Sequence, residues 1–137
     1  MSDRPLPDWP ATTPPSFRLL VTGGRDFTDA AFVNARLDDV AAKHPRITII
    51  HGACYTSVNA DKLAGQWAHE HGHRVEEYPV YHALDGAWPG AGPRRNARML
   101  RSAWPVHGVV AFPGGSGTED MVKKARATGV KVWEVAP

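Results

Sequence analysis

Five short apolar runs alternate along the chain with four segments of helical periodicity, and this alternation constrains the fold more than any other feature. The runs have the length and the β-branched content of buried strands. They cover residues 17–22, 46–50, 74–78, 106–112 and 131–135. Strands that are joined by helices run parallel, and right-handed crossovers then place helices on both faces of the sheet. The pattern therefore predicts an α/β fold, a Rossmann-like three-layer sandwich with a mainly parallel sheet of about five strands.

The helical segments carry start and stop signals. The expected starts are Thr28 or Asp29, Asn59, Pro93 and Thr118. Side chains of Ser, Thr, Asn and Asp cap helix N-termini, and proline is favoured in the first turn. Residues that stop a helix follow the first, second and fourth segments; they are Pro45, Gly72 and Gly129. These signals set the expected helix boundaries.

One domain accounts for most of the chain. With 137 residues, the chain is long enough for one domain with a substantial core and too short for two of ordinary size. Residues 1–16 hold five prolines and little that can be buried, so we expect a Pro-rich flexible N-terminal segment. Residues 17–137 then form the folded domain.

Composition excludes several classes of protein. The net charge is +2, and Lys and Arg are scattered apart from the pair Arg94 and Arg95, so nucleic-acid binding is not expected. The single cysteine, Cys54, excludes an internal disulfide framework. The N-terminal sequence has no signal-peptide pattern, and no apolar run has membrane length. We expect a cytoplasmic protein with no metal site, no cofactor and no membrane partner.

The fourth apolar run ends in a glycine-rich turn, Pro113–Thr118, which a helix follows. The first backbone N–H groups of a helix have no partner inside the helix and carry partial positive charge. Gly114, Gly115 and Gly117 allow a phosphate to approach this backbone closely, and Thr118 offers a hydroxyl as well as a cap. The turn therefore predicts an anion-binding site. An ordinary connection between a strand and a helix is the structural alternative.

A second glycine-rich turn, Gly23–Asp26, follows the first apolar run. Neither turn carries a Gly-Lys-Ser/Thr sequence or a G-x-G-x-x-G fingerprint, so a P-loop ATPase or a conventional NAD dehydrogenase is not expected. In the common strand order 3-2-1-4-5 the first and fourth strands are neighbours, and a crevice opens between their carboxyl ends. We therefore expect both glycine-rich turns to meet at one crevice.

Further polar residues leave the same edge of the predicted sheet. They are His51, Gly52, Asp61, Arg94, Arg95 and Asn96. The last three open the third helix, where cationic side chains meet the positive end of the helix dipole and are unfavourable by themselves. The two arginines therefore suggest an anionic ligand. A solvated surface or an ion pair with Asp85 is the alternative.

Four blocks of the sequence, residues 21–27, 51–68, 92–99 and 112–118, resemble the YspA-like, cpYpsA-related branch of the SLOG superfamily. The blocks occur in the family's order and span nearly all of the folded part. SLOG proteins share a Rossmannoid fold and include the LOG phosphoribohydrolases and the DNA-processing protein DprA. The resemblance implies binding of a nucleotide or nucleotide-derived ligand, and it implies a homodimer.

The turns, the loops and the resemblance together give a candidate ligand-binding set. In it, Asp26 and Asp61 would accept hydrogen bonds from ribose hydroxyls. The full set is Gly23, Gly24, Arg25, Asp26, His51, Gly52, Asp61, Arg94, Asn96, Pro113, Gly114, Gly115, Ser116, Gly117 and Thr118.

LOG enzymes cleave the N-glycosidic bond of a nucleoside monophosphate with an arginine of an Arg-Lys-x-x-Met segment and a glutamate that closes Pro-Gly-Gly-x-Gly-Thr-x-x-Glu. Arg95 matches the first motif with Asn96 in place of the lysine, and Met121 stands at the glutamate position. If hydrolysis occurs, Arg95 would hold the phosphate, and Glu119 or Asp120 would stabilise an oxocarbenium-like state or activate water. The alternative for both carboxylates is to complement the helix dipole.

Two functions from different classes stay open. Met121 favours a non-catalytic sensing or ligand-binding module, whereas Arg95 with two nearby carboxylates keeps a phosphoribohydrolase-like enzyme open. The loop after His51 is longer than in the family pattern, so ligand preference can differ. Within this loop Tyr55 would either stack on a base or only cover the loop.

Overall fold

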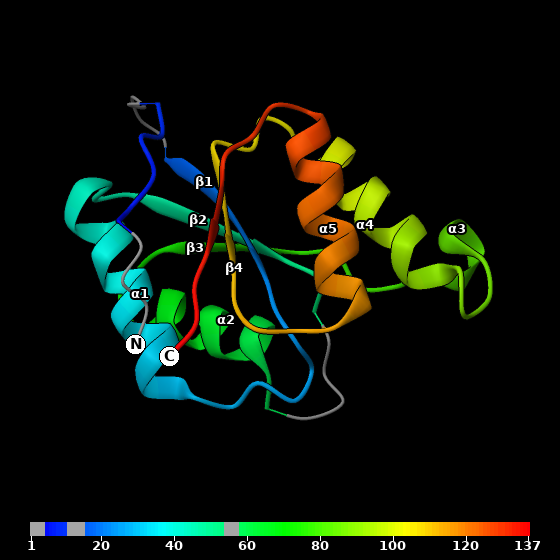
Figure 1. The fold of residues 1–137 in the computed structure, drawn as a ribbon, viewed down its shortest axis with the longest axis horizontal. Helices are drawn as coiled ribbons and strands as arrows, with labels where there is room; N and C mark the ends of the chain where they lie inside the picture. The colour runs from blue at the N-terminus through cyan, green and yellow to red at the C-terminus, as the bar shows by residue number, and fades with distance from the viewer. Residues whose placement is uncertain (1–4, 11–15, 54–57) are drawn as a thin grey trace.

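A computed structural model of the protein describes residues 5–10, 16–53 and 58–137. Five strands form one sheet in the order β3-β2-β1-β4-β5, and every neighbouring pair is parallel (Figure 1). The strands are β1 (Phe17–Thr22), β2 (Ile47–His51), β3 (Arg74–Glu77), β4 (Gly108–Ala111) and β5 (Val132–Glu134). The Rossmann-like architecture and the strand order predicted from the sequence are confirmed.

Helices cover both faces of the sheet. They are α1 (Ala30–Lys43), α2 (Ala60–Glu70), α3 (His82–Asp85), α4 (Ala91–Ser102) and α5 (Ser116–Ala127). The helices α1 and α2 pack on one face and α4 and α5 on the other, whereas the short α3 lies beyond the start of α4 (Figure 1). No helix in the described parts of the chain is long and apolar enough to span a membrane.

Two helix starts agree with their predicted caps. The Asp29 carboxylate accepts a hydrogen bond from the Phe32 N–H at 3.0 Å, and the Asn59 side chain accepts one from the Lys62 N–H at 3.0 Å. Each bond satisfies one of the N–H groups that a helix leaves without a partner. Local side-chain chemistry is therefore enough to locate these two boundaries.

Two other helix starts differ from the prediction. The helix α4 begins at Ala91, two residues before Pro93. The helix α5 begins at Ser116 with Gly115 as its N-cap, so the prediction that Thr118 caps this helix is wrong. The Thr118 side chain instead packs over Gly114, where its hydroxyl would clash with an added Cβ atom. The helix α3 was not predicted at all, because four residues carry no helical periodicity.

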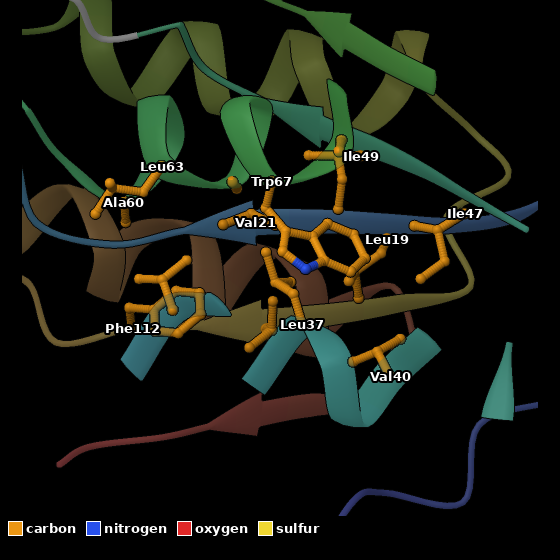
Figure 2. Close-up of a cluster of buried hydrophobic side chains, with 14 of the residues drawn as sticks. Leu19, Val21, Leu37, Val40, Ile47, Ile49, Ala60, Leu63, Trp67 and Phe112 are labelled. Carbon is orange, nitrogen blue, oxygen red and sulfur yellow. The ribbon is translucent and has the colours of Figure 1, made fainter. Parts of the chain in front are cut away.

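The side chains of β1 alternate between two cores. Leu19 and Val21 face α1 and α2, whereas Leu20 faces α4 and α5. Figure 2 shows the first core, in which the indole of Trp67 on α2 lies among the strand side chains and Leu37 of α1. The Trp67 indole N–H donates to the Asp38 carboxylate of α1 at 2.9 Å. The one polar atom of this buried side chain therefore has a hydrogen-bond partner.

Trp9 belongs to the first core although it lies in the segment that we expected to be a flexible lead-in. Its side chain is 6% exposed, and its ring centroid lies 5.4 Å from that of Phe17. The indole N–H donates to the carbonyl of Lys131 at 3.0 Å. A Cβ atom at Gly108 would lie 2.5 Å from this indole, so the absence of a side chain in β4 makes room for Trp9.

We predict that Trp9 and Gly108 are energetically coupled. Gly108→Ala should cost about 2 kcal/mol because the new methyl group overpacks the indole. Trp9→Ala should cost about 3 kcal/mol through the loss of buried aromatic area. In the Trp9→Ala background, Gly108→Ala should cost close to nothing, which a double-mutant cycle by denaturant unfolding measures. An equal cost in both backgrounds would mean that Trp9 does not occupy this place.

Candidate functional site

The two glycine-rich turns lie against each other at the carboxyl ends of β1 and β4. The Gly24 N–H donates to the Pro113 carbonyl at 2.8 Å. A Cβ atom at position 24 would lie 3.0 Å from the Cα of Gly114, and one at position 23 would lie 2.6 Å from the Cβ of Ala60. Packing alone therefore requires glycine at these positions, and the convergence expected from the strand order is present.

The N-terminus of α5 offers backbone donors without acceptors. Its N-cap is Gly115, which has no side chain to accept a hydrogen bond. Within the part of the chain that the structure describes, no acceptor meets the amides of Ser116, Gly117 and Thr118. Such a row of amides at the positive end of a helix dipole is suited to an anion.

Gly115 and Gly117 leave this row of amides uncovered. A Cβ atom at either position would meet no described atom within 4 Å. Packing therefore requires glycine at neither residue 115 nor residue 117.

The Arg95 side chain links the ends of two other strands. Its Nη1 donates to the carbonyl of Gly52 at 2.6 Å and to that of Tyr78 at 3.2 Å. These residues follow β2 and β3, so the guanidinium lies at the same edge of the sheet as the glycine-rich turns. A Cβ atom at Gly52 would lie 2.5 Å from Nη1, so a side chain at position 52 would displace the guanidinium from this place.

Asn96 connects Arg95 to the second glycine-rich turn. Its side chain is buried, and its Oδ1 accepts a hydrogen bond from Nε of Arg95 at 3.2 Å. Its Nδ2 donates to the carbonyl of Gly117 and to Oδ2 of Asp120, both at 3.1 Å. This one amide therefore ties α4 to the first turn of α5.

The two candidate catalytic carboxylates point in different directions. Asp120 accepts hydrogen bonds from Asn96 and from Lys124, on the side of α5 that faces α4. Glu119 is exposed and lines a recess on the β5 side of the same helix. Met121 is fully buried in the second core. The position that holds glutamate in the LOG motif therefore contributes a core side chain.

His51 shapes the turn after β2. The ring is 1% exposed, and its Nδ1 accepts a hydrogen bond from the Ala53 N–H at 2.9 Å. Burial lowers the pKa of His51, and the nearby carboxylates of Asp61 and Glu77 oppose this only in part. Nε2 lies 3.6 Å from a carboxylate oxygen of Glu77, but a neutral ring makes no ion pair there. Since Nδ1 is an acceptor, the ring proton resides on Nε2.

The remaining candidate site residues lie at the same edge of the sheet and differ in burial and in hydrogen-bond partners. Asp61 is buried in the first turn of α2, whereas Arg25 and Asp26 are exposed on the first glycine-rich turn. The Arg94 side chain turns away from Arg95, and its Nη1 donates to the backbone carbonyl of Asp85 at 3.1 Å. Tyr55 and Cys54 lie outside the described residues.

Asp85 has a partner that the sequence did not indicate. Its carboxylate is 1% exposed and accepts two hydrogen bonds from Arg98, each of 2.8 Å, and one from the Tyr81 N–H. The Arg98 guanidinium, more than any other group, lowers the pKa of Asp85 to about 2. The stabilisation is therefore present at neutral pH and is lost as the pH falls through that value. The ion pair that we considered for Arg94 or Arg95 is made by Arg98, one helical turn later.

A recess with a volume of about 760 Å³ opens beside the second glycine-rich turn, on the side away from Arg95. Gly114, Thr118 and Glu119 line one of its walls. Across residues 5–10, 16–53 and 58–137, no three His, Cys, Asp or Glu side chains are grouped as a metal site would require.

We predict that His51 is neutral with its proton on Nε2 throughout the neutral pH range. Long-range ¹⁵N–¹H correlation NMR reports the protonation of each ring nitrogen, and His51→Gln assigns the resonance. Titration of the ring should fall below the usual range of histidine, because burial disfavours the charged form. A proton on Nδ1, or a normal midpoint, would contradict the acceptor role of Nδ1.

We also predict that Asn96 stabilises the junction of α4 and α5. Asn96→Ala removes the donor of two hydrogen bonds and should cost about 2 kcal/mol in the free energy of unfolding. Arg101→Ala is the matched control, because Arg101 is an exposed side chain of the same helix and its loss should cost less than about 0.5 kcal/mol. Equal losses, measured by denaturant unfolding, would refute the special role of Asn96.

The first half of the fold matches a known protein family. Residues 17–81 match the family model of the YspA, cpYpsA-related SLOG family. This part comprises β1 to β3 with α1 and α2, and it includes the first glycine-rich turn, His51 and Asp61. A comparison with curated proteins found no match. The resemblance noted in the sequence is confirmed over residues 17–81, which match the model of the YspA, cpYpsA-related SLOG family.

Proposed function

We propose that the protein binds a nucleotide or nucleotide-derived ligand at the carboxyl edge of the sheet, as a sensing or ligand-binding module. The observation that carries this proposal is the uncovered row of amides at Ser116, Gly117 and Thr118. A phosphate group is the anion that such a helix start binds most readily in proteins. Membership of the SLOG family supports a nucleotide as the source of that phosphate.

The two kinds of glycine in the second turn support the same proposal. Gly114 is required because its Cα lies against Gly24 and Thr118. Gly115 and Gly117 have no comparable requirement from packing. An exposed glycine that the fold does not need makes sense where a ligand must approach the backbone closely.

Arg95 and the first glycine-rich turn complete the proposed site. The Arg95 guanidinium lies at the strand ends through its bonds to Gly52 and Tyr78 and adds positive charge to this edge. Asp26 and Asp61 are proposed as partners of ribose hydroxyls. The homodimer and the cytoplasmic location expected from the sequence stay predictions.

A phosphoribohydrolase-like enzyme is the second candidate. Asn96 touches both Arg95 and Asp120, and this link favours a shared role for the arginine and the carboxylate. Three observations disfavour catalysis. The Asp120 carboxylate already accepts hydrogen bonds from Lys124 and Asn96, and Glu119 faces the β5 side of α5, away from Asp120. The buried Met121 supplies no carboxylate. We therefore favour a binding module over a hydrolase.

We predict that Gly117→Ala weakens the binding of adenosine monophosphate about tenfold, which corresponds to roughly 1.4 kcal/mol. The new methyl group meets no atom of the described residues within 4 Å, so the melting temperature should not fall, but it covers the amides that the phosphate needs. Gly92→Ala is the matched control, since Gly92 is the second residue of α4 as Gly117 is of α5. Calorimetric titration measures both affinities.

The same samples decide between the two candidate functions. Chromatography after incubation with nucleoside monophosphates would reveal free base and ribose phosphate. Binding without release of base supports the module, whereas release that disappears in Arg95→Ala would establish the hydrolase. If the folded parent protein binds no mononucleotide, or if Gly117→Ala binds as tightly as the parent, the proposed phosphate site is wrong.

A further inference from the structure

The recess beside the second glycine-rich turn is not explained by a phosphate site alone. It lies between the outward side of α5 and the chain that follows β4 and β5. Its volume of about 760 Å³ is within the range of small-molecule sites in proteins, roughly 300–1,000 Å³. Gly114 and Thr118 belong both to this recess and to the turn, so the two are continuous.

The floor of the recess is apolar, and its rim carries equal numbers of acidic and basic side chains. Ala111, Phe112, Val122 and Val135 supply the apolar lining. Two acidic and two basic side chains also line the recess, and the pair Arg126–Glu134 is joined at 2.7 Å. The other two, Glu119 and Lys123, stand one helical turn apart on α5. The formal charge of the four side chains sums to zero, which is unlike a site for a second phosphate.

The other side of the glycine-rich turn is occupied by the protein itself. There Asn96 bonds the carbonyl of Gly117, and Arg95 bonds Asn96 and Gly52. For a ligand whose phosphate binds the first amides of α5, protein side chains fill the space toward α4, whereas the recess toward β5 is open to the rest of the ligand.

We infer that this recess binds the nucleobase of the ligand whose phosphate lies on the α5 amides, an inference that rests on the proposed function. A nucleobase is flat, uncharged at neutral pH and has hydrogen-bond donors and acceptors around its edge. An apolar floor covers its faces, and carboxylate and ammonium groups at the rim meet its edge. Glu119 then accepts hydrogen bonds from an amino group of the base and determines specificity.

Filling the recess tests this inference. Ala136 is exposed and lines the recess, so Ala136→Trp adds bulk there without disturbing the core. Ala127→Trp is the matched control, because Ala127 is an exposed alanine at the end of α5 outside the lining. Each variant is titrated calorimetrically with adenosine monophosphate and with ribose 5-phosphate, which has the phosphate and sugar but no base.

The parent protein and Ala127→Trp should bind adenosine monophosphate at least tenfold more tightly than ribose 5-phosphate. In Ala136→Trp this preference should vanish, while the affinity for ribose 5-phosphate stays within twofold. If Ala136→Trp keeps the preference for the nucleotide, the base lies elsewhere and the inference fails, although the proposed phosphate site stands. If the parent protein binds neither compound, both the inference and the proposed function fail.

A second variant checks the role of Glu119. Glu119→Gln replaces a pure acceptor with a group that also donates, so the preference among adenosine, guanosine, cytidine and uridine monophosphates should change at least fivefold. An unchanged order of affinities would remove Glu119 from base recognition.

Discussion

The close approach of the β1 and β4 carboxyl ends is the constraint on which the fold and the candidate site both depend. The hydrogen bond from Gly24 to Pro113 spans 2.8 Å, and an added Cβ atom at position 24 would lie 3.0 Å from the Cα of Gly114. A side chain at either glycine would push the strand ends apart. Because β1 is the central strand, between β2 and β4, such a shift would disturb both halves of the sheet.

That constraint separates two roles of glycine in one turn. Gly114 serves the packing of the protein, whereas Gly115 and Gly117 border open space and leave backbone donors exposed. Glycine is therefore a structural requirement at position 114 and borders an accessible surface at positions 115 and 117. The buried amide of Asn96 holds this surface at a fixed distance from Arg95, so the candidate site is built from elements that pack rigidly on the sheet.

The accuracy of the sequence-based predictions follows the range of the interactions involved. The caps Asp29 and Asn59 act within three residues; Asn59 was located correctly, and Asp29 was one of the two predicted starts of its helix. The start of α5 was misplaced because Thr118 packs on Gly114 and does not accept a hydrogen bond as a cap. The burial of Trp9 was missed because it depends on a contact with β4, about a hundred residues away in the sequence.

The alternation of apolar runs and helical segments determined the parallel sheet with helices on both faces, because these follow from periodicity and crossover handedness. The meeting of the glycine-rich turns at one edge followed once the common strand order was assumed. Only the tertiary structure decided which polar side chains reach that edge. Arg94 and Arg95 are adjacent, as are Glu119 and Asp120, yet the members of each pair point apart because consecutive residues of a helix differ by about 100°. The apolar pattern sets the rotation of each helix, but the polar contacts that then form depend on neighbouring elements, as Asn96 of α4 shows with Asp120 of α5.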